Sequence, residues 1–307
     1  MLQTYCTVSL YIWLRAIRIK FLLSSVISAT LGGIIALYSY NDVSVFDLLL
    51  VIIGVMVLHA SVDLLNDYRD YRRGIDTKTR RTGMSGGTGV LPEGLLLPGT
   101  IYRAGLLCLL AGGAVGAYYI YTHGVIIGII LGFAILSIYF YSTKIVDWGL
   151  GETFVGIKGA LIVLGSYYIQ TAQLDELSIL AGAAAGSLSA FVLYMTSFPD
   201  HDADKSGGRK TLVIRLGPAS AARLYAIFPV LFAAIVIYGV YSSIFPTYCL
   251  LSLSGMPLGL MAGRSLNRDS AEPVRQMRYA LVYSRISGVL LIMSFVISFI
   301  ISTLEVV

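Results

Sequence analysis

Residues 45–76 read VFDLLLVIIGVMVLHASVDLLNDYRDYRRGID, in which a long apolar run passes without a break into a cluster of aspartates. A helix of about 20 apolar residues crosses the hydrocarbon core of a bilayer. If the helix persists to Asp70, then Asp63, Asn66, Asp67 and Asp70 share one stripe, because their spacing is i, i+3, i+4 and i+7. The segment therefore predicts a membrane-spanning helix with an acidic site at one end.

The acidic stripe is unfavourable without a cation. Its like charges repel, and the C-terminal end of a helix already disfavours anions through the macrodipole. We expect Gly74 to end the helix, so that Asp76 turns back toward the same site. The cluster thus favours a bound positive ion.

The rest of the chain repeats the apolar pattern. Of its 307 residues, 57% are hydrophobic and only 13% are charged, too few charges to cover a soluble globule. We therefore predict an all-α polytopic membrane protein, a single domain over residues 1–307, with nine transmembrane helices around a central cavity. The nine runs cover residues 17–38, 45–65, 100–121, 124–143, 152–170, 178–198, 219–240, 244–263 and 281–303.

Basic residues indicate the orientation of these spans. All 22 Lys and Arg fall in the N-terminal segment, in the loops near 66–99, 144–151, 199–218 and 264–280, or at adjacent helix ends. The positive-inside rule then places the N-terminus in the cytoplasm and, after nine spans, Val307 outside. This distribution explains the basic character of the chain as a topology signal or as attraction to anionic headgroups, so nucleic acid is not the expected partner. Residues 1–16 are expected to lie in the membrane interface.

A second acidic cluster follows the sixth apolar run, on the side of the membrane that carries the first. Asp200 and Asp204 share a helix face, whereas Asp202 points elsewhere and is expected to be solvated. Carboxylates suit a hard cation such as Mg²⁺, which is typically held by one or two carboxylates and by substrate phosphates. Basic residues follow each cluster and suit the remaining phosphate oxygens. The two clusters together predict a magnesium diphosphate site capped by loops 66–99 and 199–218.

The motifs resemble those of the UbiA superfamily of intramembrane prenyltransferases, and the resemblance covers nearly the whole chain. Asn66-Asp67-x-x-Asp70 is similar to the first motif of that family. Asp200-x-x-x-Asp204, followed by Lys205 and by TLVIRLG at residues 211–217, is similar to the second.

Other features narrow the resemblance. Asp76 follows Asp70 by six residues, as in the menaquinone branch, the dihydroxynaphthoate prenyltransferases, and the segments 85–91 and 149–155 are also similar to that branch. Asp63 departs from it, since Asn is commoner there. Archaeal-type geranylgeranylglyceryl phosphate prenyltransferases share the fold and both motifs, so both acceptor types stay open.

The resemblance implies that an allylic diphosphate ionises and that an electron-rich acceptor captures the carbocation. Tyr139 and Tyr141 would stabilise the cation through their ring faces, beside the catalytic Asp67, Asp70, Asp200 and Asp204. The implied metal-binding set is Asp63, Asn66, Asp67, Asp70, Asp76, Asp200 and Asp204. The implied substrate-binding set is Arg18, Lys20, Asn66, Arg72, Lys144, Lys205, Arg209 and Lys210, with Lys144 and Lys210 preferred for the phosphate oxygens.

Several other residues have simpler interpretations. We expect His59 to form a hydrogen bond between helices, and Lys158 to snorkel or to pair with Glu152 or Asp147. The glycine-rich segment 83–89 lacks the ending of a phosphate-binding loop and is expected to act as a lid. Acidic ends after the second and sixth spans suggest two four-helix halves plus one helix, with an apolar groove for the prenyl tail.

Two other classes of protein fit the sequence less well. A cation-coupled transporter also carries intramembrane acids, but its site lies near the midplane, whereas these aspartates lie at one membrane surface beside Arg and Lys. A non-enzymatic scaffold leaves the convergence of two acidic clusters unexplained.

Overall fold

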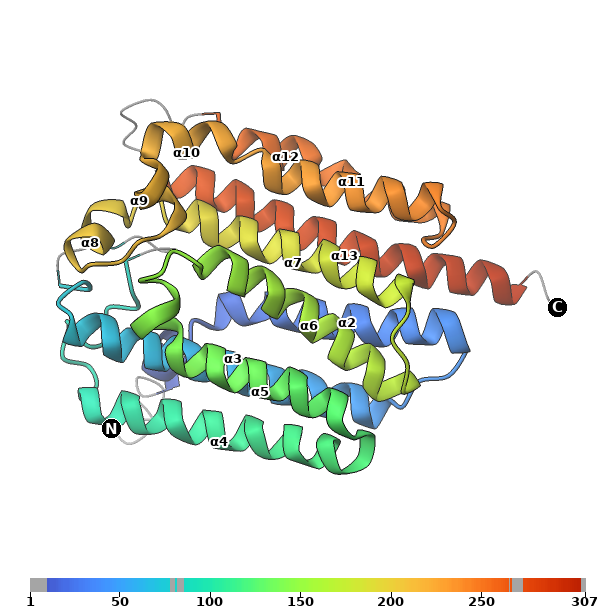
Figure 1. Ribbon diagram of the computed structural model, residues 1–307, viewed down its shortest axis with the longest axis horizontal. Coiled ribbons are helices and arrows are strands. Elements are labelled where there is room, and N and C mark those ends of the chain that lie inside the picture. The colour runs from blue at the N-terminus through green and yellow to red at the C-terminus, as the bar shows by residue number, and fades with distance from the viewer. Residues whose placement is uncertain (1–9, 78–80, 82–85, 265, 267–272, 305–307) are drawn as a thin grey trace.

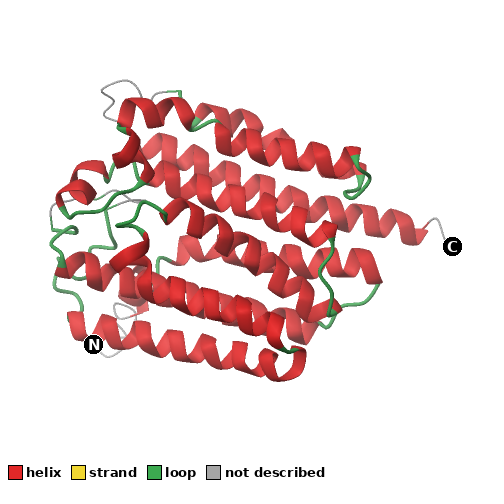
Figure 2. Ribbon diagram, in the orientation of Figure 1, coloured by secondary structure: helices red, strands yellow, loops and turns green. Residues whose placement is uncertain are grey.

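The computed structural model describes residues 10–77, 81, 86–264, 266 and 273–304, and all regular structure in these ranges is helical (Figures 1 and 2). Most elements coincide with the predicted apolar runs. In chain order, the helices are α2 (Ile19–Tyr40), α3 (Val45–Arg72), α4 (Pro98–His123), α5 (Val125–Phe140), the π-helix η1 (Tyr141–Ile145), α6 (Gly151–Thr171), α7 (Glu176–Thr196), α8 (His201–Ser206), α9 (Leu212–Leu216), α10 (Pro218–Leu224), α11 (Ile227–Tyr241), the 3₁₀-helix η2 (Thr247–Gly255), α12 (Met256–Met261) and α13 (Pro273–Leu304).

Seven helical segments of the described chain are long and apolar enough to cross a membrane, so the predicted number of nine spans is not confirmed. The seven are Ile19–Tyr40, Val45–Arg72, Pro98–His123, Val125–Ile145, Glu176–Thr196, Pro218–Tyr241 and Arg275–Leu304.

The other two predicted runs are helical but differ from an apolar span. Helix α6 has 21 residues, yet it contains the charged Glu152 and Lys158. The run expected at 244–263 forms nine residues of 3₁₀-helix and six of α-helix. Because a 3₁₀-helix rises about 2.0 Å per residue, this segment still extends roughly 27 Å.

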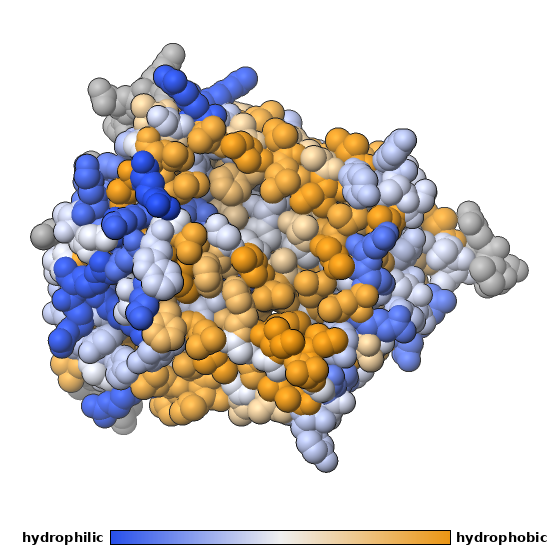
Figure 3. All heavy atoms as spheres, viewed as in Figure 1, coloured by the Kyte–Doolittle hydropathy of each residue, from blue (hydrophilic) through white to orange (hydrophobic). Residues whose placement is uncertain are grey.

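The long helices lie side by side along one axis, and the short helices α8 and α9 lie at one end of the bundle (Figure 1). Helix α6 packs against α7, α3 against α4, and α2 against α3, α6, α7 and α13. The visible face has an apolar band in its middle, with hydrophilic residues gathered at the α8 and α9 end and a smaller set opposite (Figure 3). This distribution fits a bundle that exposes its middle to lipid.

The core differs in character along the bundle. Fully buried aromatic side chains, among them Phe191, Tyr194, Phe232 and Tyr283, fill the space between α7, α11 and α13. The Tyr194 hydroxyl donates to the backbone oxygen of Ala221 at 2.7 Å, which satisfies its polar group in the core. The part of the bundle formed by α7, α11 and α13 therefore has a well-packed core.

Glycine allows α6 and α7 to approach closely. A Cβ atom built on Gly186 would lie 2.5 Å from the backbone oxygen of Gly156, so the two backbones are in direct contact. A Cβ atom on Gly132 of α5 would meet no atom within 4 Å. The two positions therefore differ in packing within the same bundle.

We predict that Gly186→Ala destabilises the protein by about 1–3 kcal/mol, because the added methyl group has to push a backbone aside. Gly132→Ala is the matched control and should leave stability unchanged or slightly raised, since alanine is the better helix former. Thermal unfolding of both variants in one detergent measures the difference. Equal unfolding temperatures would contradict the close approach of α6 and α7.

Candidate active site

A cavity of about 370 Å³ lies between the helices and reaches from the end where α8 lies far into the bundle. Asn66 and Val51 of α3 both line it, and fifteen residues of helix extend about 22 Å. Asp200, Asp204 and Arg209 line its polar end, whereas most of its length is walled by aliphatic and aromatic side chains. The cavity therefore offers one charged mouth and a long apolar interior.

The first acidic cluster is built by the extension of α3 to Arg72, beyond its apolar part, which confirms that the helix persists past Asp70. Asp67 and Asp70 are buried at this end. Gly74 then turns the chain with φ of +72°, and Asp76 is buried against Gly87, where a Cβ atom would lie 2.6 Å from the Asp76 Oδ1. The expected return of Asp76 to the acidic end is confirmed.

Arg18 compensates the charge of Asp67. Its Nη2 lies 2.6 Å from the Asp67 Oδ1, and the Thr88 hydroxyl donates to the other oxygen of the same carboxylate. Arg18 occupies the left-handed region, with φ of 47°, directly before α2. Three separate segments of the chain therefore meet at one buried carboxylate.

Arg209 joins the two acidic clusters. Its Nη1 donates to the Asp204 Oδ1 at 3.0 Å, and its Nη2 donates to the Asp70 Oδ1 and, at 3.1 Å, to the Asn66 Oδ1. The Asn66 amide also donates to the second oxygen of Asp70 at 2.7 Å. Side chains more than 130 positions apart in sequence thus face each other across a single guanidinium group.

Asp200 completes the acidic end but is poorly compensated. Its Oδ2 accepts a long hydrogen bond of 3.4 Å from the Gly86 amide, and its buried Oδ1 has no hydrogen-bond partner among the described residues. Burial and the nearby Asp204 raise the pKa of Asp200 to about 7. Burial, followed by the charges of Asp70 and Asp67, likewise raises the pKa of Asp76 to about 7.

The acidic end fits a divalent cation that arrives with its ligand. The carboxylate groups here outnumber the two guanidinium groups of Arg18 and Arg209. Carboxylate oxygens are also ligands that suit Mg²⁺. No three His, Cys, Asp or Glu side chains of the described residues lie close enough to form a metal site by themselves. A metal held by one or two carboxylates and completed by phosphate oxygens matches this separated arrangement.

The expected site residues divide into three groups. Arg18, Asp63, Asn66, Tyr141, Asp200, Asp204 and Arg209 line the cavity. Asp67, Asp70 and Asp76 are buried beside its mouth. The exposed side chains that do not line it are those of Lys20, Arg72, Tyr139, Lys144, Lys205 and Lys210.

Two of these exposed residues have other contacts. The Tyr139 ring lies 4.9 Å from the Arg69 guanidinium, and the Lys144 ammonium lies 5.4 Å from the Phe140 ring. Asp202 is fully exposed, which confirms that it is solvated.

The interior of the cavity contains polar side chains, and one of the two alternatives expected for Lys158, pairing with Glu152 or Asp147, was wrong. His59 forms the expected hydrogen bond between helices, 2.7 Å from the Ser25 hydroxyl. Lys158, however, pairs with neither expected acid. Asp147 pairs with Arg73 at 3.0 Å, and Glu152 accepts from the Leu212 amide at 3.3 Å. The reason is geometric, because a residue six positions after Glu152 faces another side of the helix.

Two arginines belong to the site although sequence reasoning missed them. Arg285 of α13 lines the cavity and donates to the backbone oxygen of Lys20. Its position within an apolar span was the available signal, since a charge there usually has a function. Arg73 donates to the Ser142 backbone oxygen, to Asp147 and to the Gly207 backbone oxygen, and so joins α3, η1 and α8.

The described part of the glycine-rich segment contacts both acidic clusters. Residues 86–90 include the Gly86 amide on Asp200 and the Thr88 hydroxyl on Asp67. Residues 83–85 of the expected lid lie outside the described residues, as do residues 1–9 of the expected interfacial segment. Closure of this segment over the site stays a prediction.

Comparisons with known proteins agree on one family. The model of the UbiA prenyltransferase family matches residues 25–285. A relative named 1,4-dihydroxy-2-naphthoate octaprenyltransferase from Escherichia coli is 29% identical over 70% of this chain and 71% of its own length.

Solved structures show the same fold. A UbiA homolog from Archaeoglobus fulgidus bound to DMAPP and Mg²⁺ has a TM-score of 0.63 and 15% identity over 91% of this chain and 98% of its own. A structure titled for digeranylgeranylglyceryl phosphate synthase has a TM-score of 0.61 and 18% identity over 95% and 98%.

The raised pKa values of Asp76 and Asp200 predict that the metal-free protein loses stability as pH rises. Their ordinary value is 3.8. Between about pH 4 and pH 7 the folded protein therefore holds protons that the unfolded chain has released, and each pH unit in that window lowers the free energy of unfolding. In EDTA, the unfolding temperature should be at least about 3 °C higher at pH 5 than at pH 8.

Asp200→Asn should flatten this pH dependence, whereas Asp202→Asn, at an exposed position, should leave it unchanged. Thermal unfolding followed by scattering or fluorescence across this pH range makes the comparison. A metal-free protein that becomes more stable toward pH 8 would show that these carboxyls are not held in a poorly compensated site.

Proposed function

The chain belongs to the UbiA prenyltransferase family and is a membrane prenyltransferase, and from this premise we propose that it transfers a prenyl chain from an isoprenoid diphosphate to an aromatic acceptor. The acceptor would be a dihydroxynaphthoate or a hydroxybenzoate, as in quinone biosynthesis. A relative named for 1,4-dihydroxy-2-naphthoate supports this acceptor class, and a neighbour bound to DMAPP and Mg²⁺ supports the donor.

The observation that carries the proposal is the meeting of both acidic clusters at Arg209. Asp67, Asp70, Asp76, Asp200 and Asp204, with Asn66 and Asp63 beside them, are the proposed holders of Mg²⁺. When bound, the metal neutralises the departing diphosphate. Arg209 and Arg18 would move from their carboxylate partners toward the phosphate oxygens, which suit guanidinium groups.

The bond changes follow from this placement. The C–O bond of the donor breaks with its electron pair leaving on the diphosphate, an acceptor carbon bonds to the allylic carbon, and that ring carbon then loses a proton. Tyr141, in the cavity wall, would stabilise the allylic cation through its ring, and Tyr139 remains a second candidate. The mouth would attract the diphosphate through exposed charges at Lys20, Arg72, Lys144, Lys205 and Lys210.

The apolar interior suits the hydrocarbon part of the donor. Val51, Tyr119, Ile127 and Ile169 line the cavity far from the acidic end. A prenyl tail could lie along these residues while its head stays at the carboxylates. By the charge distribution in the sequence, the acidic end would face the cytoplasm, with the N-terminus on the same side and the C-terminus outside.

Two alternatives lead to different products. A glyceryl phosphate lipid could be the acceptor, and the fold shared with a structure titled for digeranylgeranylglyceryl phosphate synthase keeps this candidate. A cation-coupled transporter would place its acids near the membrane midplane. Asp67 and Asp70 lie instead in the last turns of α3, and Asp200 and Asp204 lie at the start of α8 and within it.

We predict that the purified protein with Mg²⁺, a prenyl diphosphate and 1,4-dihydroxy-2-naphthoate forms a prenylated naphthoate and releases diphosphate. Asp70→Asn and Asp200→Asn should each lower the rate by about 100-fold or more, since removing one transition-state electrostatic contact costs that much. Asp202→Asn is the matched control and should keep the activity. Mass spectrometry of the product and a diphosphate assay measure both ends of the reaction.

Three acceptors in one mixture distinguish the alternatives: dihydroxynaphthoate, hydroxybenzoate and a glyceryl phosphate lipid. Prenylation of the lipid alone would replace the aromatic acceptor. Solute uptake driven by a proton or sodium gradient, with no diphosphate released from any prenyl donor, would refute the proposed reaction altogether.

A further inference from the structure

Lys158 is a basic side chain inside the bundle that the proposed diphosphate site does not use. It lies seven residues into α6, about 10 Å from the start of that helix, and it lines the cavity. Among the described residues it has neither a hydrogen bond nor an ion pair, and the acids expected to neutralise it contact other groups. An ammonium group in such a place usually has a partner or a ligand.

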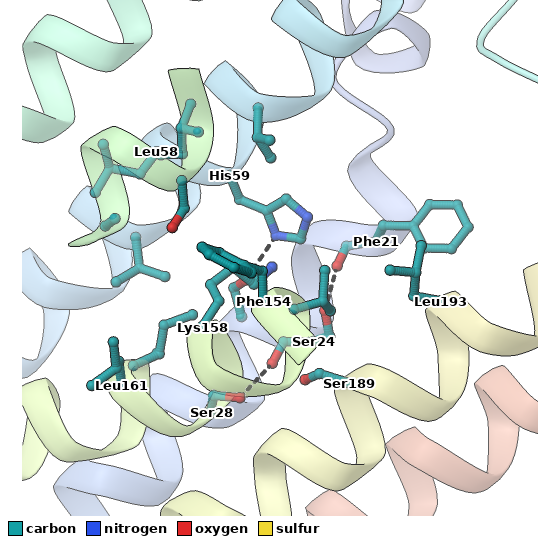
Figure 4. Close-up of a pocket in the computed structure, with 18 of the residues that line it drawn as sticks. Phe21, Ser24, Ser28, Leu58, His59, Phe154, Lys158, Leu161, Ser189 and Leu193 are labelled. Carbon is teal, nitrogen blue, oxygen red and sulfur yellow. Dashed lines mark hydrogen bonds between the residues drawn. The ribbon is translucent and has the colours of Figure 1, made fainter. Parts of the chain in front are cut away.

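The side chains facing Lys158 across the cavity come from α3. His59 and Asp63 lie one turn apart, with the His59 Nε2 3.9 Å from the Asp63 Oδ2. Figure 4 shows His59 and Lys158 pointing into the same space from opposite walls. All three side chains line the cavity, yet the lysine and Asp63 form no ion pair in the described structure. Lys158 of α6 and these side chains of α3 therefore belong to the lining of the same cavity.

An aromatic wall adjoins this cation. Phe154 precedes Lys158 by one helical turn, and both line the cavity (Figure 4). Its ring stacks on that of Phe133 from α5, with centroids 5.5 Å apart and an interplanar angle of 13°. A stacked pair of this kind presents a flat apolar face to a planar ligand.

Distance along α3 relates this space to the diphosphate end. Asp63 is three residues from Asn66, which corresponds to about 5 Å, and His59 is about one turn deeper. A bicyclic ring with its acidic group at Lys158 would therefore extend toward Asn66. Its reactive carbon would then lie near the place where the diphosphate leaves.

We propose that Lys158 binds the acidic group of the acceptor, so that the enzyme selects aromatic acceptors that carry a carboxylate. The acceptor ring would lie beside Phe154, and Ser25 would hold His59 in the opposite wall through the bond of 2.7 Å. This inference rests on the proposed prenyl transfer to an aromatic acceptor, and it assigns Lys158 a role in binding the acceptor that is separate from binding the donor.

The test compares two acceptors that differ only in the carboxylate, 1,4-dihydroxy-2-naphthoate and 1,4-dihydroxynaphthalene, with the full-length enzyme in lipid nanodiscs. Lys158→Met keeps the length of the side chain and removes its charge. It should raise the KM for the naphthoate by about 10-fold or more, because a charge-assisted bond is lost. The KM for the prenyl diphosphate and the kcat/KM for the naphthalene should stay within about 2-fold.

Two further variants and one binding measurement complete the design. Lys158→Arg retains the charge and should recover part of the preference for the naphthoate. Arg223→Met removes an exposed positive charge outside the cavity lining. This variant should leave the kcat/KM unchanged for both acceptors. Fluorescence titration with the naphthoate alone should show weaker binding to Lys158→Met than to the unaltered protein.

The outcomes separate the two proposals. If Lys158→Met lowers kcat/KM equally for both acceptors, Lys158 only supports the fold or Asp63, and the inference is overturned while the proposed function stands. If the unaltered protein prenylates neither aromatic compound and binds neither, the proposed function fails and takes the inference with it.

Discussion

The contact of one guanidinium group with carboxylates from two distant segments is the interaction on which the site depends. Arg209 holds Asp204 and Asp70 together, and Arg18 holds Asp67 beside them. The site contains six aspartates, Asp63 included, which is more than these two arginines can neutralise. The carboxylates at the acidic end therefore repel one another, and this repulsion is unfavourable. Such a cost persists only where the surrounding packing enforces it, and it is relieved when a cation binds.

The packing that enforces it is distributed over the whole bundle. Close backbone contact between α6 and α7, made possible by glycine, and the aromatic core between α7, α11 and α13 fix the position from which the chain enters α8. Arg73 ties the ends of α3 and α8 to η1. The carboxylates are therefore placed by elements that are themselves held by apolar burial, and a single loop does not determine them.

Much of the fold and of the acidic end could be predicted from the sequence. The stripe from Asp63 to Asp70 follows helical periodicity, and Gly74 turns the chain as a glycine at a positive φ does. Helical periodicity and motif spacing could not predict which side chains the tertiary packing directs into the cavity. Lys144 and Lys210 are near the motifs in sequence, but their long side chains reach solvent. Lys158 and Arg285 enter the cavity because of how α6 and α13 face their neighbours. The 3₁₀ geometry of η2 likewise has no simple pattern that predicts it.

The length of the cavity has a consequence for how reactants and products would move. The cavity joins a charged mouth to an apolar interior that extends about 22 Å along α3, so it offers a polar and an apolar environment side by side. A donor with a hydrocarbon tail would need to expose none of that tail to water at any stage. Its pyrophosphate would escape to the aqueous phase, whereas the alkylated product would have exchanged a charged head for an aromatic one and would partition into the lipid. The reaction would thereby be drawn forward by the separation of its two products into different phases.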